Sequence, residues 1–341
     1  MRRSRSSIRI AAALLALSTA LGCTVALAQD QDEQRAQWLA ETFPANGRDL
    51  AIEVGDADVV VRNGDVDEIT FEVWFRARDL NAARDRVERM NFRAEDDGNT
   101  VRILSDAVDD DWRDWDWRRW GSFDVVVEAI VPEAIDAHIV SGDGDVSVQR
   151  LNGRITVIAE DGDVLADSLT GSIELRSNDG DLGVRSVGGA SLIAHTDDGD
   201  VTLGDLTSGT VDIHTDDGDI QGTRLSAGSS QVVTGDGDIV MDSVAGEFDA
   251  RTGDGDIHVS IDRLDSTSLT TTEGDITIRA GAQLAANLDL RGPGLSMREA
   301  VRANFKGRVE RRLIEGALNG GGPALQARTQ DGTIVLRLNR D

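Results

Sequence analysis

Acidic residues recur at a fixed spacing through the middle of this chain. Between positions 141 and 280, the order acidic residue, glycine, aspartate, aliphatic residue occurs eight times, with a period of about 19 residues. Repeated carboxylates are the oxygen ligands that calcium prefers. The alternative is structural, because an aspartate in a turn accepts backbone amide hydrogen bonds while a glycine adopts a positive φ. The central glycines are Gly144, Gly162, Gly180, Gly199, Gly218, Gly237, Gly255 and Gly274.

Each repeat contributes one carboxylate on either side of its central glycine. The residue before it belongs to the first aspartate ladder: Asp143, Asp161, Asp179, Asp198, Asp217, Asp236, Asp254 and Glu273. The residue after it belongs to the second aspartate ladder: Asp145, Asp163, Asp181, Asp200, Asp219, Asp238, Asp256 and Asp275. Carboxylates stacked about 5 Å apart repel by about 0.8 kcal/mol per pair even in water, so calcium or turn amides must offset this cost. The candidate calcium ligands are Asp198, Asp200, Asp217, Asp219, Asp236, Asp238, Asp254 and Asp256, and no other cofactor is indicated.

Alternating aliphatic residues must position these turns. Apolar side chains at every second position belong on one face of a β-strand, and one period of the repeat is too short for a strand-helix-strand crossover. The pattern therefore predicts an all-β fold, a parallel β-solenoid with two short strands per coil, in preference to a sandwich or propeller. We expect one column to point inward: Val146, Val164, Leu182, Val201, Ile220, Ile239, Ile257 and Ile276.

The flanks of the repeat are less regular. We expect a signal peptide over 1–28, a poorly structured segment over 29–47 with a short helix near 34–41, and a solenoid domain over 48–341. The regular repeats span 141–280, between degenerate flanks at 48–140 and 281–341. One helix is predicted where Leu80, Ala83, Val87 and Met90 share a face, and strands are expected at TVRIL and FDVVVEAIVP. Because Gly332 follows Gly274 at close to three times the period of the repeat, degenerate coils are expected around Leu288, Leu290, Phe305 and Val309.

A tryptophan-rich loop, DDDWRDWDWRRW, falls between two of these strands. Exposed indoles stack on sugars or on partner side chains, so the loop is a candidate ligand-binding site. The alternative is that the indoles fold back and cap an end of the solenoid. The residues concerned are Trp112, Trp115, Trp117 and Trp120, four of the six tryptophans.

The N-terminal segment 1–28 combines four arginines, an apolar stretch and an Ala26-Leu27-Ala28 end, the pattern of a secretory signal peptide. Cleavage there removes Cys23, the only cysteine, whereas lipidation of Cys23 would anchor an outer-membrane lipoprotein. The exported chain, periplasmic or at the cell surface, cannot depend on disulfides. No further stretch is apolar enough to span a bilayer.

The net charge argues against anionic partners and favours cations. The chain has 35 basic and 62 acidic residues, a net charge of −27, and loss of the four signal arginines gives −31. Such a surface repels nucleic acid and anionic headgroups and attracts cations.

The chain has no catalytic signature motif: the nucleophile elbow, zinc-protease helix and phosphate loop are all missing from the sequence. His195 and His214, at one position of adjacent repeats, have a spacing that could share a metal, although outward strand positions often hold polar residues by chance. A polysaccharide lyase or hydrolase should interrupt its repeat with unusual residues, and here the acidic residues are the repeat. We therefore do not expect an enzyme.

The opening DLAIEVGDADVVVRNGD, the TDDGDI-like turns and the closing GALNGGGPALQARTQDGTIVLRL resemble the bacterial putative-adhesin family of β-strand-repeat domains of unknown function. The resemblance covers about residues 48–341, and GGGP followed by a T-x-D-G-x-I strand is its most specific part. It implies a solenoidal β fold in an envelope or surface protein. The tryptophan-rich insert and the regular acidic turns depart from the family pattern.

Together these features indicate an exported, non-enzymatic structural or adhesive module of the cell envelope. The alternative is a carbohydrate-binding or carbohydrate-degrading envelope protein that uses the Trp112–Trp120 loop. An envelope protein or a glycan would be its partner, and the sequence specifies neither that partner nor the oligomeric state.

Overall fold

The computed structural model describes residues 34–106 and 123–339. The chain divides into two compact units, unit 1 up to Leu169 and unit 2 from Thr170. Both consist almost entirely of strands, and the described helices are α2 (Leu80–Arg89) and α4 (Glu299–Ala303). The predicted parallel β-solenoid is therefore confirmed, with a second short helix that the sequence pattern did not indicate.

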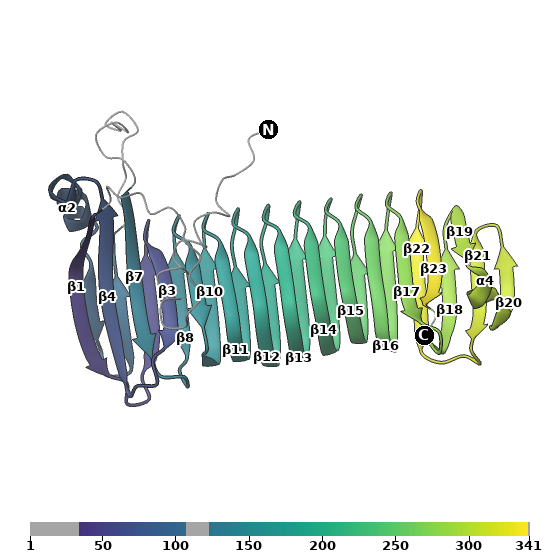
Figure 1. The fold of residues 1–341 in the computed structure, drawn as a ribbon, viewed down its shortest axis with the longest axis horizontal. Coiled ribbons are helices and arrows are strands. Elements are labelled where there is room, and N and C mark those ends of the chain that lie inside the picture. The colour runs from purple at the N-terminus through teal and green to yellow at the C-terminus, as the bar shows by residue number, and fades with distance from the viewer. Residues whose placement is uncertain (1–33, 107–122, 340–341) are drawn as a thin grey trace. The chain divides into compact units, whose positions relative to one another are not determined.

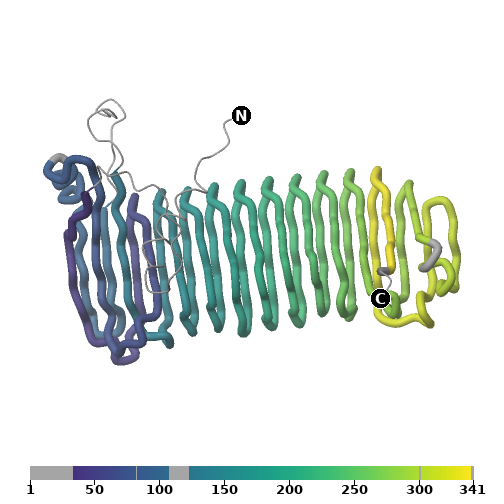
Figure 2. The backbone as a smooth tube through the Cα atoms, viewed as in Figure 1, coloured from purple at the N-terminus to yellow at the C-terminus, as the bar shows by residue number. Residues whose placement is uncertain are grey.

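Unit 2 contains five long strands that each follow the chain from one acidic turn to the next. They are β12 (Leu182–His195), β13 (Val201–Thr215), β14 (Ile220–Thr234), β15 (Ile239–Arg251) and β16 (Ile257–Thr271). Each pairs in parallel with the next, so that equivalent residues of successive repeats face one another, as Val201 faces Ile220. Figures 1 and 2 show these strands side by side, with the turns at one edge.

Two short strands per repeat were expected, but each repeat of unit 2 forms one continuous strand. The chain bends within this strand while its hydrogen bonds to the neighbouring coils continue. In β13 the buried side chains occur at 201 and 203, then 206 and 208, then 211, 213 and 215. The alternation slips by one residue after 203 and again after 208, where the chain turns a corner. Glycines with positive φ lie at the second corner of other coils, including Gly189 (φ 123°) and Gly246 (φ 113°).

The aliphatic column after the acidic turns lies in the core. Its eight members, from Val146 to Ile276, are each at most 1% exposed. The inward orientation predicted from the alternation is therefore confirmed. Burial of a side chain of this size stabilises the folded state by about 1.5–3 kcal/mol, which makes the column a major source of stability in a chain without disulfides.

The degenerate coils expected between Gly274 and Gly332 are found around Leu288 and Leu290 but not around Phe305 and Val309, which lie on an antiparallel strand. β16 pairs along its second half with β22 (Ala324–Thr329), and β17 (Ile276–Gly281) pairs with β23 (Thr333–Asn339). The turn at Gly332 therefore stacks directly on the turn at Gly274. The spacing failed as a count of coils because the intervening residues lie beyond β22 and β23 and not before them.

Those intervening residues form the end of unit 2. β18 (Ala286–Arg291) is parallel to β22, and β19 (Gly294–Met297) is parallel to β23. Two antiparallel strands follow on the outside, β21 (Leu313–Leu318) against β18 and β20 (Phe305–Glu310) against β21. β20 is a charged, largely exposed edge strand, a feature that discourages pairing with other chains.

In unit 1 also, the order of the strands in the sheet differs from their order in the sequence. One row of parallel strands runs β6 (Thr100–Leu104), β2 (Asp49–Val54), β8 (Ala137–Ser141), β10 (Asn152–Ala159). The other runs β7 (Phe123–Val131), β3 (Asp58–Asn63), β9 (Val146–Gln149), β11 (Val164–Arg176). The coil β2–β3 thus lies between β6–β7 and β8–β9, although β6 and β7 come later in the sequence.

Antiparallel strands and a helix lie at the outer side of unit 1. β5 (Arg93–Asp96) pairs with β6, β4 (Glu68–Ala77) with β7, and β1 (Gln34–Pro44) with β4. The predicted helix is confirmed as α2, which buries Ala83 and Val87. Met90, directly after its end, is also buried, and Leu80 is partly exposed.

The helix expected near residues 34–41 and the poorly structured segment 29–47 are wrong where the structure describes them. Residues 34–44 are strand β1, because Trp38 and Phe43 pack edge-on against Phe75 and Phe71 of β4. Tertiary packing here overrides a weak local helical preference. The signal peptide and Cys23 lie outside the described residues, and the domain limits stay a prediction.

Neither of the helices described is long and apolar enough to cross a membrane.

Candidate functional site

The acidic turns stack so closely that only glycine fits at their centre. A Cβ built on Gly237 would lie 2.0 Å from the carbonyl oxygen of Gly218, and the equivalent distance from Gly255 to Gly237 is 1.9 Å. The predicted positive φ is wrong for these residues, since neither has one. The requirement for glycine comes from the approach of the neighbouring coil's backbone.

A column of hydroxyl side chains holds each turn to the one before it. Thr234, three residues before its central glycine, donates a hydrogen bond to the Gly218 carbonyl (2.9 Å) and accepts one from the Gly237 amide (3.2 Å). Thr215, Thr252, Thr271 and Thr329 make the same pair of bonds in their own turns. Sequence reasoning missed this column, although a threonine opens five of the eight repeat motifs.

The second aspartate ladder is a chain of hydrogen bonds between coils. The Asp219 amide donates to Oδ1 of Asp200 (2.8 Å), and the Asp238 amide donates to Oδ1 of Asp219 (2.8 Å). In unit 2 the series continues to the Thr333 amide, which donates to Asp275 (2.7 Å). A hydrogen bond to a charged group is worth about 1.5–3 kcal/mol, against about 0.8 kcal/mol of repulsion between neighbours. The turn-amide explanation therefore accounts for this ladder.

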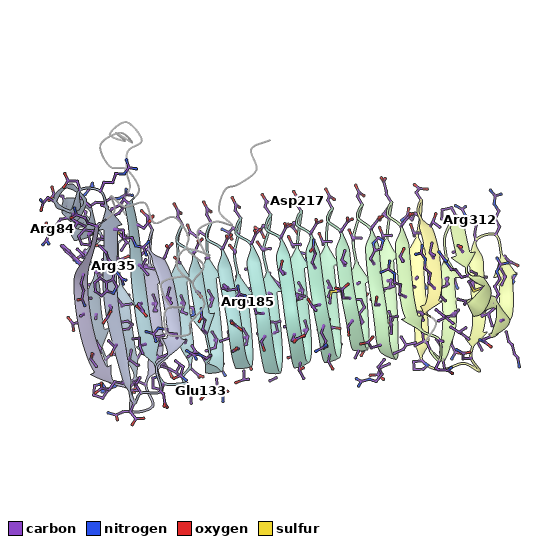
Figure 3. The ribbon with its side chains drawn as sticks, in the orientation of Figure 1. Arg35, Arg84, Glu133, Arg185, Asp217 and Arg312 are labelled. Carbon is purple, nitrogen blue, oxygen red and sulfur yellow. The ribbon has the colours of Figure 1, made fainter. Side chains whose placement is uncertain are left out.

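The first aspartate ladder differs in its hydrogen bonding, because among the described residues its carboxylates in unit 2 accept no amide from the next coil. Asp198, Asp217, Asp236 and Asp254 are all exposed, and Figure 3 shows Asp217 at the tip of its turn. Their backbone amides donate to the preceding coil, as Asp217 does to the Asp197 carbonyl (3.1 Å). The structure therefore brings the eight candidate calcium ligands to one edge of unit 2 but divides them between a row whose carboxylates accept inter-coil amides and a row whose carboxylates do not.

These carboxylates do not surround a common point at which a metal ion could bind. Among the described residues, no group of three or more histidine, cysteine or acidic side chains has a geometry that could hold a metal ion. His195 and His214 do lie on adjacent coils, with ring centroids 5.7 Å apart. Their Nε2 atoms face different carboxylates, Asp212 at 3.6 Å and Asp216 at 3.0 Å respectively.

We expect calcium and sodium chloride of equal ionic strength to raise the melting temperature of the protein alike. Both would screen the exposed first ladder, and the second ladder already accepts amide hydrogen bonds. A calcium ion bound between coils at a hundredfold excess over its Kd would instead add about 2.7 kcal/mol that sodium cannot supply. Thermal unfolding followed by circular dichroism in matched salt series measures the difference.

The control is a variant with Asp217, Asp219, Asp236 and Asp238 changed together to Asn. Asn retains an oxygen that can accept the inter-coil amide, so the variant removes charge while preserving the turn. A rise of several degrees that is specific to calcium and lost in this variant would contradict the expectation and establish a metal site.

The candidate residues Trp112, Trp115, Trp117 and Trp120 lie outside the described residues. They lie in the sequence between β6 and β7, the strands that pair with β2 and β3. The other two tryptophans lie on neighbouring strands of unit 1, Trp38 on β1 and Trp74 on β4. Arg35 stacks over the Trp74 ring at 4.0 Å.

Parallel coils of 18 or 19 residues, held by aspartate, threonine and glycine columns, place the molecule among the β-solenoid proteins. Residues 166–337 match the family model described as Toastrack DUF4097. The chain belongs to this family of unknown function, which confirms the resemblance inferred from its turns and its closing strand.

The chain also aligns with solved structures at low sequence identity. A putative adhesin from Parabacteroides merdae ATCC 43184 is 11% identical, with 90% of this chain and 97% of that chain covered and a TM-score of 0.45. A putative lipid binding protein from Parabacteroides distasonis ATCC 8503 is 9% identical, with 90% and 98% covered and a TM-score of 0.41. A putative adhesin from Bacteroides fragilis NCTC 9343 is 11% identical, with 88% and 96% covered and a TM-score of 0.32. No curated protein matches the sequence significantly.

Proposed function

We propose that this protein is an exported, non-enzymatic β-solenoid that acts as a structural or adhesive module of the bacterial cell envelope. One observation carries the proposal: some of the repeated polar side chains join the coils, and the carboxylates of the first aspartate ladder are left for contacts outside the solenoid. Threonines and the second aspartate ladder bond one coil to the next. The first ladder contributes one of the exposed carboxylates of each coil, at a spacing of about 4.8 Å.

A regular row of charges suits attachment to another extended surface. Each exposed carboxylate contributes weakly by itself, because water and salt screen it. Several of them on one rigid edge engage a surface together, and linked contacts reach an avidity that none has alone. The net charge of −27 points to a cationic surface or one that is bridged by cations.

The proposal can be tested by export and attachment. Tagged full-length protein, expressed in a bacterium with an outer membrane, should be found in the envelope fraction. Beads coated with residues 29–341 should adhere to envelope fragments, and adhesion should fall at least threefold when Asp198, Asp217, Asp236 and Asp254 are changed to Asn. The melting temperature of that variant should not fall, since these side chains are exposed. Retention in the cytosol, or beads that bind no more than uncoated ones, would refute the proposal.

A carbohydrate-binding protein that uses the Trp112–Trp120 loop is the second candidate. Its support is the composition of this segment, which concentrates four of the six tryptophans with three arginines and acidic residues. Aromatic side chains of this kind supply stacking surfaces for ligands.

The two candidates differ in their effect on tryptophan fluorescence. If the loop binds sugar, titration with cell-wall or capsular glycans should give a saturable shift. The shift should disappear when Trp115 and Trp117 are changed to Ala and persist when Trp74, on β4, is changed to Phe. We expect no saturable shift, as the structural or adhesive function requires none, and a shift that follows this pattern would favour the second candidate.

A further inference from the structure

The end of unit 2 has an arginine-rich pocket in a protein that is otherwise strongly acidic. Residues 282–341 contain ten basic and six acidic residues, whereas the whole chain has a net charge of −27. A pocket of about 450 Å³ lies in this part of the unit, and none of its lining residues is acidic. The charged side chains that line it are Arg291, Arg312 and Arg328.

The pocket forms because four chain segments end at one place. They are the end of β16, the end of β18, the end of β22 and the turn between β20 and β21. In the outermost coil, Gly292 and Pro293 occupy the position of an acidic turn, so the aspartate ladders stop before it. Figure 3 shows Arg312 at this end of unit 2.

The positive charge of the pocket is only partly neutralised. Asp289 accepts a hydrogen bond from Nε of Arg291 at 2.7 Å, and its other oxygen lies 3.9 Å from Arg328. This bond raises the pKa of the Arg291 guanidinium. Within the described part of the chain, no acidic side chain forms an ion pair with Arg312. Arg291 and Arg328 therefore share the Asp289 carboxylate, with a weaker coulombic contribution from Glu315 to Arg291.

The remaining lining suits a ligand that is larger than a bare ion. Thr270, Thr272 and Gln330 add hydroxyl and amide groups, and Pro293 adds an apolar surface. Guanidinium groups bind carboxylate and phosphate through paired hydrogen bonds. A volume of about 450 Å³ falls in the range of small-molecule sites.

We propose that this pocket binds a sugar-sized anion whose carboxylate or phosphate group is held by Arg312 and Arg328, with Arg291 beside them. The hydroxyl and amide groups would then receive the polar remainder of the ligand. The pocket lies where the acidic turn edge ends, with Thr272 and Gln330 in the last two turns, but no carboxylate of the first aspartate ladder lines it. This inference therefore does not depend on attachment by that ladder.

The proposal is tested by calorimetric titration of residues 29–341 in a phosphate-free buffer at physiological salt. The probes are glucuronate, glucose 6-phosphate, inorganic phosphate and glucose. We expect saturable binding of at least one of the anionic sugars, at least fivefold weaker binding of inorganic phosphate, and no binding of glucose. Arg312→Gln should weaken sugar binding at least fivefold, and Arg312→Gln with Arg328→Gln should abolish it.

Arg224→Gln is the matched control, because Arg224 is an exposed arginine on β14 that pairs with Asp205 at 3.4 Å. Its affinity should equal that of the wild type, and circular dichroism should show that all variants are folded. The proposal is overturned if neither anionic sugar binds or if Arg312→Gln and Arg224→Gln have the same effect. Inorganic phosphate that binds as tightly as glucose 6-phosphate would also overturn it, since the pocket would then hold a bare ion.

Discussion

Replacing Ile239 by Asp is expected to destabilise the protein by about 4 kcal/mol or more. Ile239 is fully buried and lies between Ile220 and Ile257 of the adjoining coils. The variant loses the aliphatic contacts and places a carboxylate beside Ile220 and Ile257, which offer it neither a hydrogen bond nor a positive charge. Urea unfolding followed by circular dichroism measures the change in the free energy of unfolding.

The matched control is Asp242→Asn, three residues along the same strand. Asp242 is exposed, so its replacement should change stability by less than about 0.5 kcal/mol. If Ile239→Asp were as stable as Asp242→Asn, the column from Val146 to Ile276 would not be the core of the solenoid.

Replacing Gly237 by Ala should have the second largest effect, a loss of about 3 kcal/mol, at the upper end of the cost found for over-packed cores. The added Cβ would lie 2.0 Å from the Gly218 carbonyl oxygen and 2.6 Å from its carbon. Both are backbone atoms, so the two coils must move apart, which weakens the hydrogen bonds of Thr234 and Asp238 to the preceding turn. Thermal and urea unfolding of the variant measure the loss.

Gly281→Ala separates this clash from the general effect of losing a glycine. Gly281 has nothing within 4 Å of an added Cβ and no positive φ, so alanine should be neutral or slightly stabilising. Equal melting temperatures for the two variants would show that the turns do not stack as closely as described.

The repeated part of the fold could be predicted from sequence because each of its columns has one chemical role. Aliphatic alternation predicted the strands and their inward face, and the fixed glycine spacing predicted the length of a coil. The two aspartate ladders were also identified, but not the difference between them. Only the aspartate after the glycine accepts the amide of the next coil. This difference arises from the stacking of two coils, so the sequence of a single repeat does not reveal it.

Other features required long-range information. The central glycine of each turn was identified from the repeat, but the reason for it was not. The carbonyl of the preceding coil excludes a Cβ there, and residues near the glycine in sequence do not indicate this contact. β1 was mistaken for a helix since its aromatic partners, Phe71 and Phe75, lie on a strand that is distant in the sequence. The arginine pocket was missed because Arg291, Arg312 and Arg328 come from separate segments with no common spacing.

The insertion of β22 and β23 between earlier strands has a consequence for the order of folding. The Thr333 amide must find Asp275, 58 residues away, whereas the Asp219 amide finds Asp200 at a distance of 19 residues. Closing a longer loop costs more entropy and slows folding. A chain that becomes available from its N-terminus, as during synthesis, can stack β12 to β16 as they emerge. The growing edge of β16 and β17 then stays open until β22 and β23 arrive, so unit 2 closes only after the residues up to Asn339 are available.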